Sequence, residues 1–147
     1  MDRIRTTVIA LALFACASAA GATERPSDPI RRAAPVGITE AFYTCLDKAD
    51  YDSIAVGACL SAEDDVQDAR LNRAYKTLMG KLDGKAREQL LASERAWLTF
   101  QGKSSGLEST LYGSEIIANL EVSQREMFRK CERANTLDTY VSLVSDE

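Results

Sequence analysis

All three prolines of this 147-residue chain, Pro26, Pro29 and Pro35, lie close together near its beginning. A proline inside a helix removes a backbone hydrogen bond and clashes with the preceding turn, so a long segment without proline can be helical throughout. Residues 36–147 form such a segment, and strand-like alternation is scarce in it. We therefore expect an all-α protein: a small helical bundle or hairpin with one long central helix.

Apolar residues recur at helical spacing in several segments separated by turn signals. We predict a short helix from Thr39, a long helix over about 54–82, a third over about 85–101, and further helical structure over about 115–144. Residues 102–113, rich in Ser and Gly, are predicted to form a loop. The inward faces are predicted to carry Ala58, Ala62, Val66, Ala69, Leu71, Tyr75, Leu78 and Leu82 on the long helix, and Leu90, Leu91, Trp97, Leu98 and Phe100 on the third.

The first 22 residues are typical of a cleaved signal peptide. Arg3 and Arg5 precede an apolar run over residues 6–15, and small residues follow in an A-x-A pattern. We expect a periplasmic or secreted protein with a flexible linker over residues 23–38 and a helical domain over 39–147. Cys16 follows Leu-Phe-Ala, part of a lipoprotein signal, so membrane attachment is expected only if Cys16 is lipidated.

Three cysteines would follow the signal peptide into an oxidising compartment, where disulfides persist. Three thiols allow at most one internal bridge and leave one over. Cys45 and Cys59 lie at the ends of consecutive predicted helices, which favours a Cys45–Cys59 disulfide and leaves Cys131 as an unpaired thiol.

Charge and composition exclude several functions. The chain has no histidine, which removes Ser-His-Asp and Cys-His catalysis and most zinc sites. Its formal charge of -4 argues against nucleic acid, which rewards dense basic patches. No pair of carboxylates stands out for glycosidase chemistry. We expect no enzyme activity, no catalytic residue, no cofactor and no metal.

Two motifs carry a resemblance to a known family. Leu71-Asn72, Tyr75 and Leu78 form an "LN..Y..L" run, and residues 94–100 form an "RAWL.F" run that contains Arg95, Trp97 and Phe100. With cysteines on either side, the chain resembles the LprI-like lysozyme-inhibitor family of small exported helical domains. Three positions depart from that family's pattern: Glu94 replaces a usual Gln, Gln101-Gly102 replaces Arg-Asp, and Ser105 replaces a cysteine that would pair with Cys131.

The resemblance implies an exported helical binding protein that inhibits lysozyme, and the alternative is an envelope structural or interaction module with another partner. We interpret the motif residues mainly as core. Asn72 is expected to cap a helix or to link helices through its amide, and Arg95 to pair with an acid of the long helix. An acidic chain gains electrostatic steering toward a cationic lysozyme. The partner-binding candidates are an acidic helix face with Glu63, Asp64 and Asp65, and the predicted loop with Lys103 and Glu108.

Overall fold

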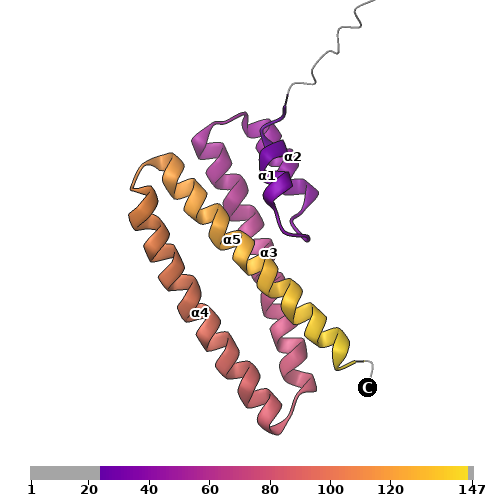
Figure 1. The fold of residues 1–147 in the computed structure, drawn as a ribbon. Coiled ribbons are helices and arrows are strands. Elements are labelled where there is room, and N and C mark those ends of the chain that lie inside the picture. The colour runs from indigo at the N-terminus through magenta and orange to yellow at the C-terminus, as the bar shows by residue number, and fades with distance from the viewer. Residues whose placement is uncertain (1–23, 146–147) are drawn as a thin grey trace, which may run out of the picture.

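The computed structural model describes residues 24–145, which fold into five helices without a strand (Figure 1). The all-α prediction is confirmed. The predicted signal peptide at residues 1–22, including Cys16, lies outside the described residues. None of the described helices is long and apolar enough to cross a bilayer. The helices are α1 Ser27–Ala33, α2 Glu40–Ala49, α3 Ser53–Lys81, α4 Gly84–Tyr112 and α5 Ile116–Leu143.

The predicted starts of two helices are confirmed by their caps. The Thr39 hydroxyl accepts a hydrogen bond from the Phe42 N–H at the start of α2, and the Asp52 carboxylate accepts one from the Ala55 N–H at the start of α3. Each side chain satisfies a backbone donor that has no partner within its helix. The turn between the two helices is sharp: Asp50 and Tyr51 both have positive φ, at 44° and 66°.

The prediction of a flexible linker over residues 23–38 is wrong, because α1 lies within it. Pro26 stands at the N-cap of α1 and Pro29 in its first turn, where a missing N–H costs no helical hydrogen bond. The N–H of buried Ser27 donates to the Asp47 carboxylate at 3.0 Å, and Ile30 packs against the core. The segment is therefore held against α2.

The prediction of a loop over residues 102–113 is also wrong, because α4 continues to Tyr112. The hydroxyl of Ser105 donates to the Gln101 carbonyl and that of Thr110 to the Gly106 carbonyl, each four residues back in the same helix. Ser and Gly lower helix propensity by a kcal/mol or less each, whereas proline, which would stop the helix, does not occur here. The helix ends at Gly113, which has a φ of 88°.

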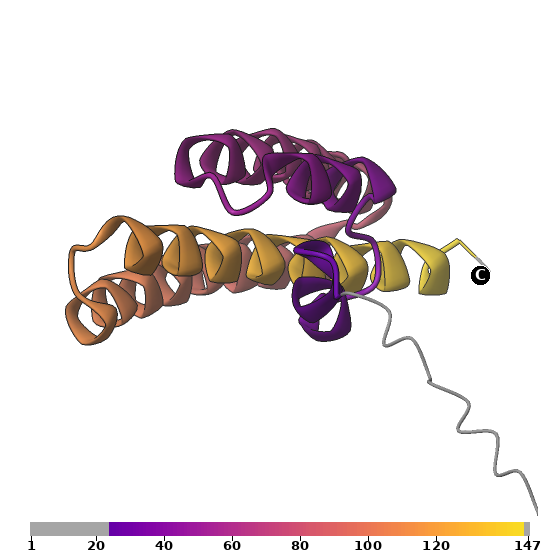
Figure 2. The same cartoon turned by 90° about the horizontal axis from the view of Figure 1, so that it is seen from above.

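The interior contains two apolar clusters on either side of the middle of α3. The first joins α2, the start of α3 and α5 around Phe42, Leu46 and Met127. The second joins the end of α3, the start of α4 and the end of α5 around Leu78, Leu90 and Leu137. Figure 2 shows α2 and the first part of α3 in one layer and α4 with α5 in another. The pairing of α3 with α5 is the largest helix contact in the fold.

Between the clusters, the inward face of α3 differs from the prediction. Ala58, Ala62, Val66 and Ala69 point outward, and the buried positions are Cys59, Leu60, Glu63, Gln67, Leu71, Ala74 and Leu78. Two of these seven are polar, so an apolar stripe could not locate this face. Leu98 and Phe100 on α4 are also exposed, at 61% and 56%, and the prediction that they face inward is wrong.

Candidate partner-binding surfaces

The disulfide between Cys45 and Cys59 is present, as predicted, with 5.8 Å between the two Cα atoms. It joins α2 to the first turns of α3. Cys131 is a free thiol, completely buried on α5. Its Sγ contacts the Arg70 guanidinium at 3.5 Å and the Val36 carbonyl at 3.3 Å. Burial raises the pKa of the Cys131 thiol, more than the neighbouring Arg70 lowers it.

Glu63 is buried, so the prediction that it lies on a solvated acidic face is wrong. Its carboxylate accepts hydrogen bonds from the Thr39 N–H at 3.0 Å, from the Thr39 hydroxyl and from Gln67 Nε2 at 2.6 Å. A buried carboxylate is tolerated when donors surround it in this way. Of its neighbours, Asp64 pairs with Lys130 of α5 at 2.6 Å and Asp65 is exposed.

The buried polar network continues from Gln67 to α5. Gln67 also donates to the Gly37 carbonyl at 3.0 Å, and Arg70 donates to Gln67 at 2.7 Å and to Asn135 at 2.9 Å. Gly37 has a φ of 107°, and an added Cβ would lie 2.6 Å from Arg70. This network therefore fastens the segment before α2 onto α3 and α5, which is a structural role.

A second set of polar contacts joins α4 to α5. Arg133 donates through Nε to Glu94 at 2.9 Å, and Arg129 donates to Gln101 at 2.7 Å, to Ser105 at 3.3 Å and to Glu108 at 2.8 Å. We call these contacts the arginine ladder. Departures from the family pattern at positions 94, 101 and 105 all contribute to it. Glu108 is thus paired within the fold, whereas Lys103 is exposed on the helix.

The two sequence motifs meet across a groove between α3 and α4. Its volume is about 250 Å³, and its walls contain Asp68, Leu71, Asn72, Tyr75, Leu91, Glu94, Arg95, Trp97 and Leu98. Trp97 is half-buried against the second cluster, together with Tyr75. Asn72 is exposed and bonds to Asp68 within its own helix, so it does not link helices. Arg95 is exposed, and within residues 24–145 it forms no ion pair with an acid of α3.

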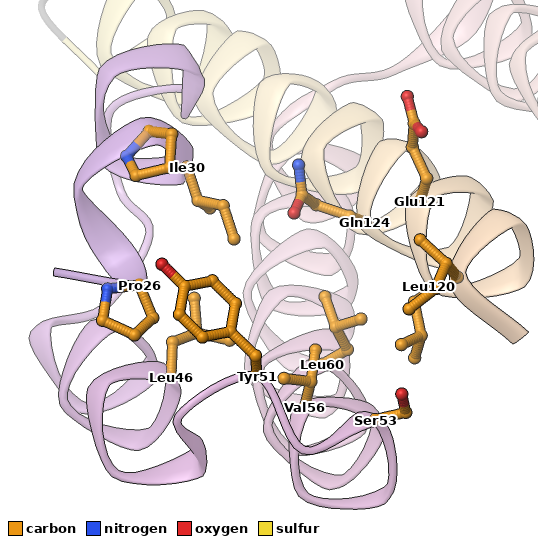
Figure 3. Close-up of a pocket in the computed structure, with 12 residues that line it drawn as sticks. Pro26, Ile30, Leu46, Tyr51, Ser53, Val56, Leu60, Leu120, Glu121 and Gln124 are labelled. Carbon is orange, nitrogen blue, oxygen red and sulfur yellow. The ribbon is translucent and has the colours of Figure 1, made fainter. Parts of the chain in front are cut away.

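A larger apolar pocket opens at the end of the molecule where α2 turns into α3 (Figure 3). Pro26 and Tyr51 stand on one side, Leu46, Val56 and Leu60 lie deeper, and Leu120, Glu121 and Gln124 of α5 stand on the other side. The volume is about 390 Å³, and Pro29, Ile30, Ser53 and Ile117 complete the lining. This size suits a large side chain of a partner or a small ligand.

A comparable pocket lies at the other end of α3. It measures about 320 Å³ between α3, α4 and α5, and is lined by Leu78, Leu82, Ala86, Gln89, Leu90, Ser93, Tyr140, Leu143 and Val144. Among the residues that the structure describes, no three acidic, cysteine or histidine side chains gather to hold a metal ion.

The family model of the lysozyme inhibitor LprI matches residues 45–137. The chain belongs to the LprI lysozyme inhibitor family. The match begins at the first disulfide cysteine and ends within α5, so it contains both motifs, the arginine ladder, all of α3 and α4 and most of α5. No curated relative and no solved structure matches this chain. LprI is a family of inhibitors, and its description implies a protein partner.

Sequence reasoning missed the pocket of Figure 3, whose lining lies partly within the LprI-matched region and partly before it. Tyr51 lies in the turn before α3, and Ile117 is the second residue of α5. Both are exposed, at 69% and 66%. The signal that the sequence offered was an apolar residue beside an acid at the start of a predicted helix, in Asp50-Tyr51-Asp52 and in Glu115-Ile116-Ile117.

Proposed function

We propose that this protein is exported and inhibits lysozyme by binding it as an intact folded domain, without catalysing a reaction. The observation that carries the proposal is the LprI match over residues 45–137. The order of charged, apolar and small residues in residues 1–22 supports export. The Cys45–Cys59 disulfide supports an oxidising destination in the periplasm or outside the cell.

Electrostatics support a cationic partner. The chain has a formal charge of -4, and cleavage after Ala22 would remove two basic residues and one acidic residue, which makes the exported part more acidic still. Opposite charge accelerates the encounter of two proteins and is screened by salt. Asp65 is exposed and adds to the negative charge that attracts a cationic partner, whereas Glu63 and Glu108 are already bonded within the fold.

The test is the clearing of a bacterial cell-wall suspension by a cationic lysozyme, with and without the purified, oxidised protein. We expect clearing to slow in proportion to the added protein and to stop near a fixed molar ratio. Reduced and unfolded protein is the matched control. Full lysozyme activity at a large molar excess of the folded protein would contradict the proposal, and would favour an envelope module with another partner.

A further inference from the structure

We infer that the pocket between α1, the α2–α3 turn and the start of α5 is the surface that docks the cationic lysozyme. The inference rests on the proposed function and adds the place of contact. We call this surface the acidic end. It consists of the 390 Å³ pocket, whose lining includes the exposed Tyr51 and Ile117 and the partly exposed Glu121, together with exposed residues close to that lining in sequence: Asp50, Asp52, Ile54, Glu115 and Ile116.

The apolar part of the acidic end is unusually exposed. Ile54 is 86% exposed, Tyr51 69%, and Ile116 and Ile117 are each 66% exposed. Tyr51 and Ile117 line the pocket, and Ile54 and Ile116 lie next to lining residues in sequence. Single exposed apolar residues are normal, but a group of them beside a pocket is typical of an interaction site. Binding energy at protein interfaces concentrates where a large side chain fills such a pocket at the centre of the contact.

The backbone at Tyr51 adds an independent observation. Tyr51 has a φ of 66°, in the left-handed region that a bulky residue seldom adopts. This conformation places the ring over the pocket beside Pro26 (Figure 3) while most of its surface remains exposed. Backbone strain of this kind persists where the surrounding structure enforces it and clusters at functional sites.

Charge decides the kind of partner. The α2–α3 turn contributes Asp50 and Asp52, and the start of α5 contributes Glu115 and Glu121. The basic residues of these segments and of the α1 region are Arg25, Arg31, Arg32, Lys48 and Arg125. Arg25 pairs with Asp28, Arg31 with Glu40, Arg32 with Glu24 and Arg125 with Glu121, which leaves Lys48 against Asp50, Asp52 and Glu115. The acidic end therefore has an excess of negative charge around an apolar centre.

The second pocket, at the other end of α3, provides an internal comparison. The turn beside it carries Lys81, Lys85 and Arg87 together with Asp83 and Glu88. That turn therefore contributes net positive charge, whereas the α2–α3 turn contributes net negative charge. A cationic protein is attracted to the acidic turn and repelled by the basic one.

The lining of the acidic end fits a long cationic side chain, with arginine as the best match. The arginine stem would pack on Tyr51, Ile117 and Leu120, as such stems do on apolar surface. The guanidinium would reach Glu121 and the amide oxygen of Gln124 at the pocket wall. Glu121 bonds to Arg125 at 2.9 Å through one carboxylate oxygen, which leaves the other for a partner.

The experiment measures association and dissociation of a cationic lysozyme on the immobilised, oxidised protein. Ile117→Lys places a like charge at the pocket, and we expect affinity to fall about tenfold or more. Glu121→Gln removes one acid, and we expect association to slow about threefold at low salt with little change in dissociation. The matched controls at the other end are Leu143→Lys and Glu88→Gln, which should bind as the unaltered protein does.

The outcomes distinguish a failure of the proposed function, lysozyme inhibition, from a failure of the proposed docking surface. Absence of binding by the unaltered, folded protein would contradict the proposed function together with the docking surface. Normal binding by both Ile117→Lys and Glu121→Gln, in a protein that does bind lysozyme, would overturn the docking surface alone. Self-association that Ile117→Lys abolishes while lysozyme binding persists would assign the acidic end to a second copy of the chain. Unchanged melting temperatures of the variants verify that they are folded.

Discussion

Helices α3 and α4 have the same length, 29 residues each, yet they are held in very different ways. Seven residues of α3 are buried, whereas Leu90 is the one buried residue of α4. α3 packs along α5 and is bridged to α2 by the disulfide. Beyond Trp97, α4 is joined to α5 chiefly by the arginine ladder, and Leu98, Phe100, Leu107 and Leu111 are exposed on it.

The difference teaches that helix length says little about how firmly a helix is anchored. Apolar burial contributes about 25 cal/mol for each Å² removed from water, which favours α3. Hydrogen-bonded ion pairs that remain partly hydrated contribute less, because desolvation of the charges offsets their attraction. We therefore expect the second half of α4 to open locally more often than α3.

The largest expected effect is in the α3–α5 region. Met127 is 0% exposed within the first cluster, so Met127→Ala leaves a cavity and should lower the free energy of unfolding by about 3–4 kcal/mol. Chemical denaturation of the oxidised protein measures this loss. Leu107→Ala, at an exposed position of α4, is the control and should change stability by about 0.5 kcal/mol or less. Equal losses of unfolding free energy for Met127→Ala and Leu107→Ala would show that α4 is anchored as firmly as the α3–α5 pair.

Removing the disulfide comes next. Replacing both Cys45 and Cys59 by Ala opens a loop of about 15 residues and should cost about 3 kcal/mol in the chain-entropy description. The control is Cys131→Ser, which keeps the bridge and a hydroxyl donor toward Val36, and should cost about 1 kcal/mol. A double alanine variant as stable as the unaltered protein would show that the first cluster alone holds α2 against α3.

In the arginine ladder, we expect the loss of one charged side chain to destabilise the fold mainly because its partner is left without a counter-charge. The side chains of Arg133 and Glu94 are 12% and 13% exposed, so removing one leaves the other nearly buried and unpaired. Arg133→Ala should cost about 2 kcal/mol, and Glu94→Ala in the same chain should add much less than it does alone. A double-mutant cycle by denaturation measures this coupling. Strictly additive effects would mean that the pair does not hold α4.

The smallest expected effect concerns the attachment of α1. Arg31 bonds to Glu40 and holds the pKa of that carboxyl below its usual value, and it also lies 3.8 Å from the centre of the Tyr43 ring. A lowered folded pKa stabilises the fold above the ordinary glutamate pKa, and this stabilisation is lost as pH falls through the folded pKa.

Glu40→Gln should therefore lower the melting temperature slightly at pH 7, and the difference from the unaltered protein should vanish as the pH falls below the lowered pKa of Glu40 in the folded protein. Because both side chains are substantially exposed, salt should reduce the difference as well. A difference in melting temperature that increases as the pH falls would contradict a lowered pKa of Glu40 in the folded protein.

How far the sequence predicts the fold differs between the same two helices. The sequence predicts the bounds of α3 from the capping residue Asp52 at its start and from the turn Asp83-Gly84 after its end. It also predicts the buried face of the last turns of α3 from the helical spacing of Leu71 and Leu78. Its buried first half could not be predicted from an apolar stripe. Glu63 and Gln67 are buried because Thr39 and Gly37, far away in sequence, supply their hydrogen-bond partners.

For α4, composition was the misleading signal. Ser and Gly over residues 102–113 suggested a loop, but serine and threonine hydroxyls bond back within the helix and Arg129 holds it from α5. The candidate site was predicted least well. The acidic end forms from three distant segments around residues 26, 51 and 117, and no local pattern records that they meet.

The most direct test of the central claim is hydrogen exchange of the oxidised protein with and without a saturating cationic lysozyme. The account predicts that lysozyme slows exchange in the α2–α3 turn and at the start of α5, around Tyr51 and Ile117, and leaves the α3–α4 turn around Lys81 unchanged. Slower exchange confined to the α3–α4 turn, or no change anywhere while lysozyme is present in excess, would contradict it.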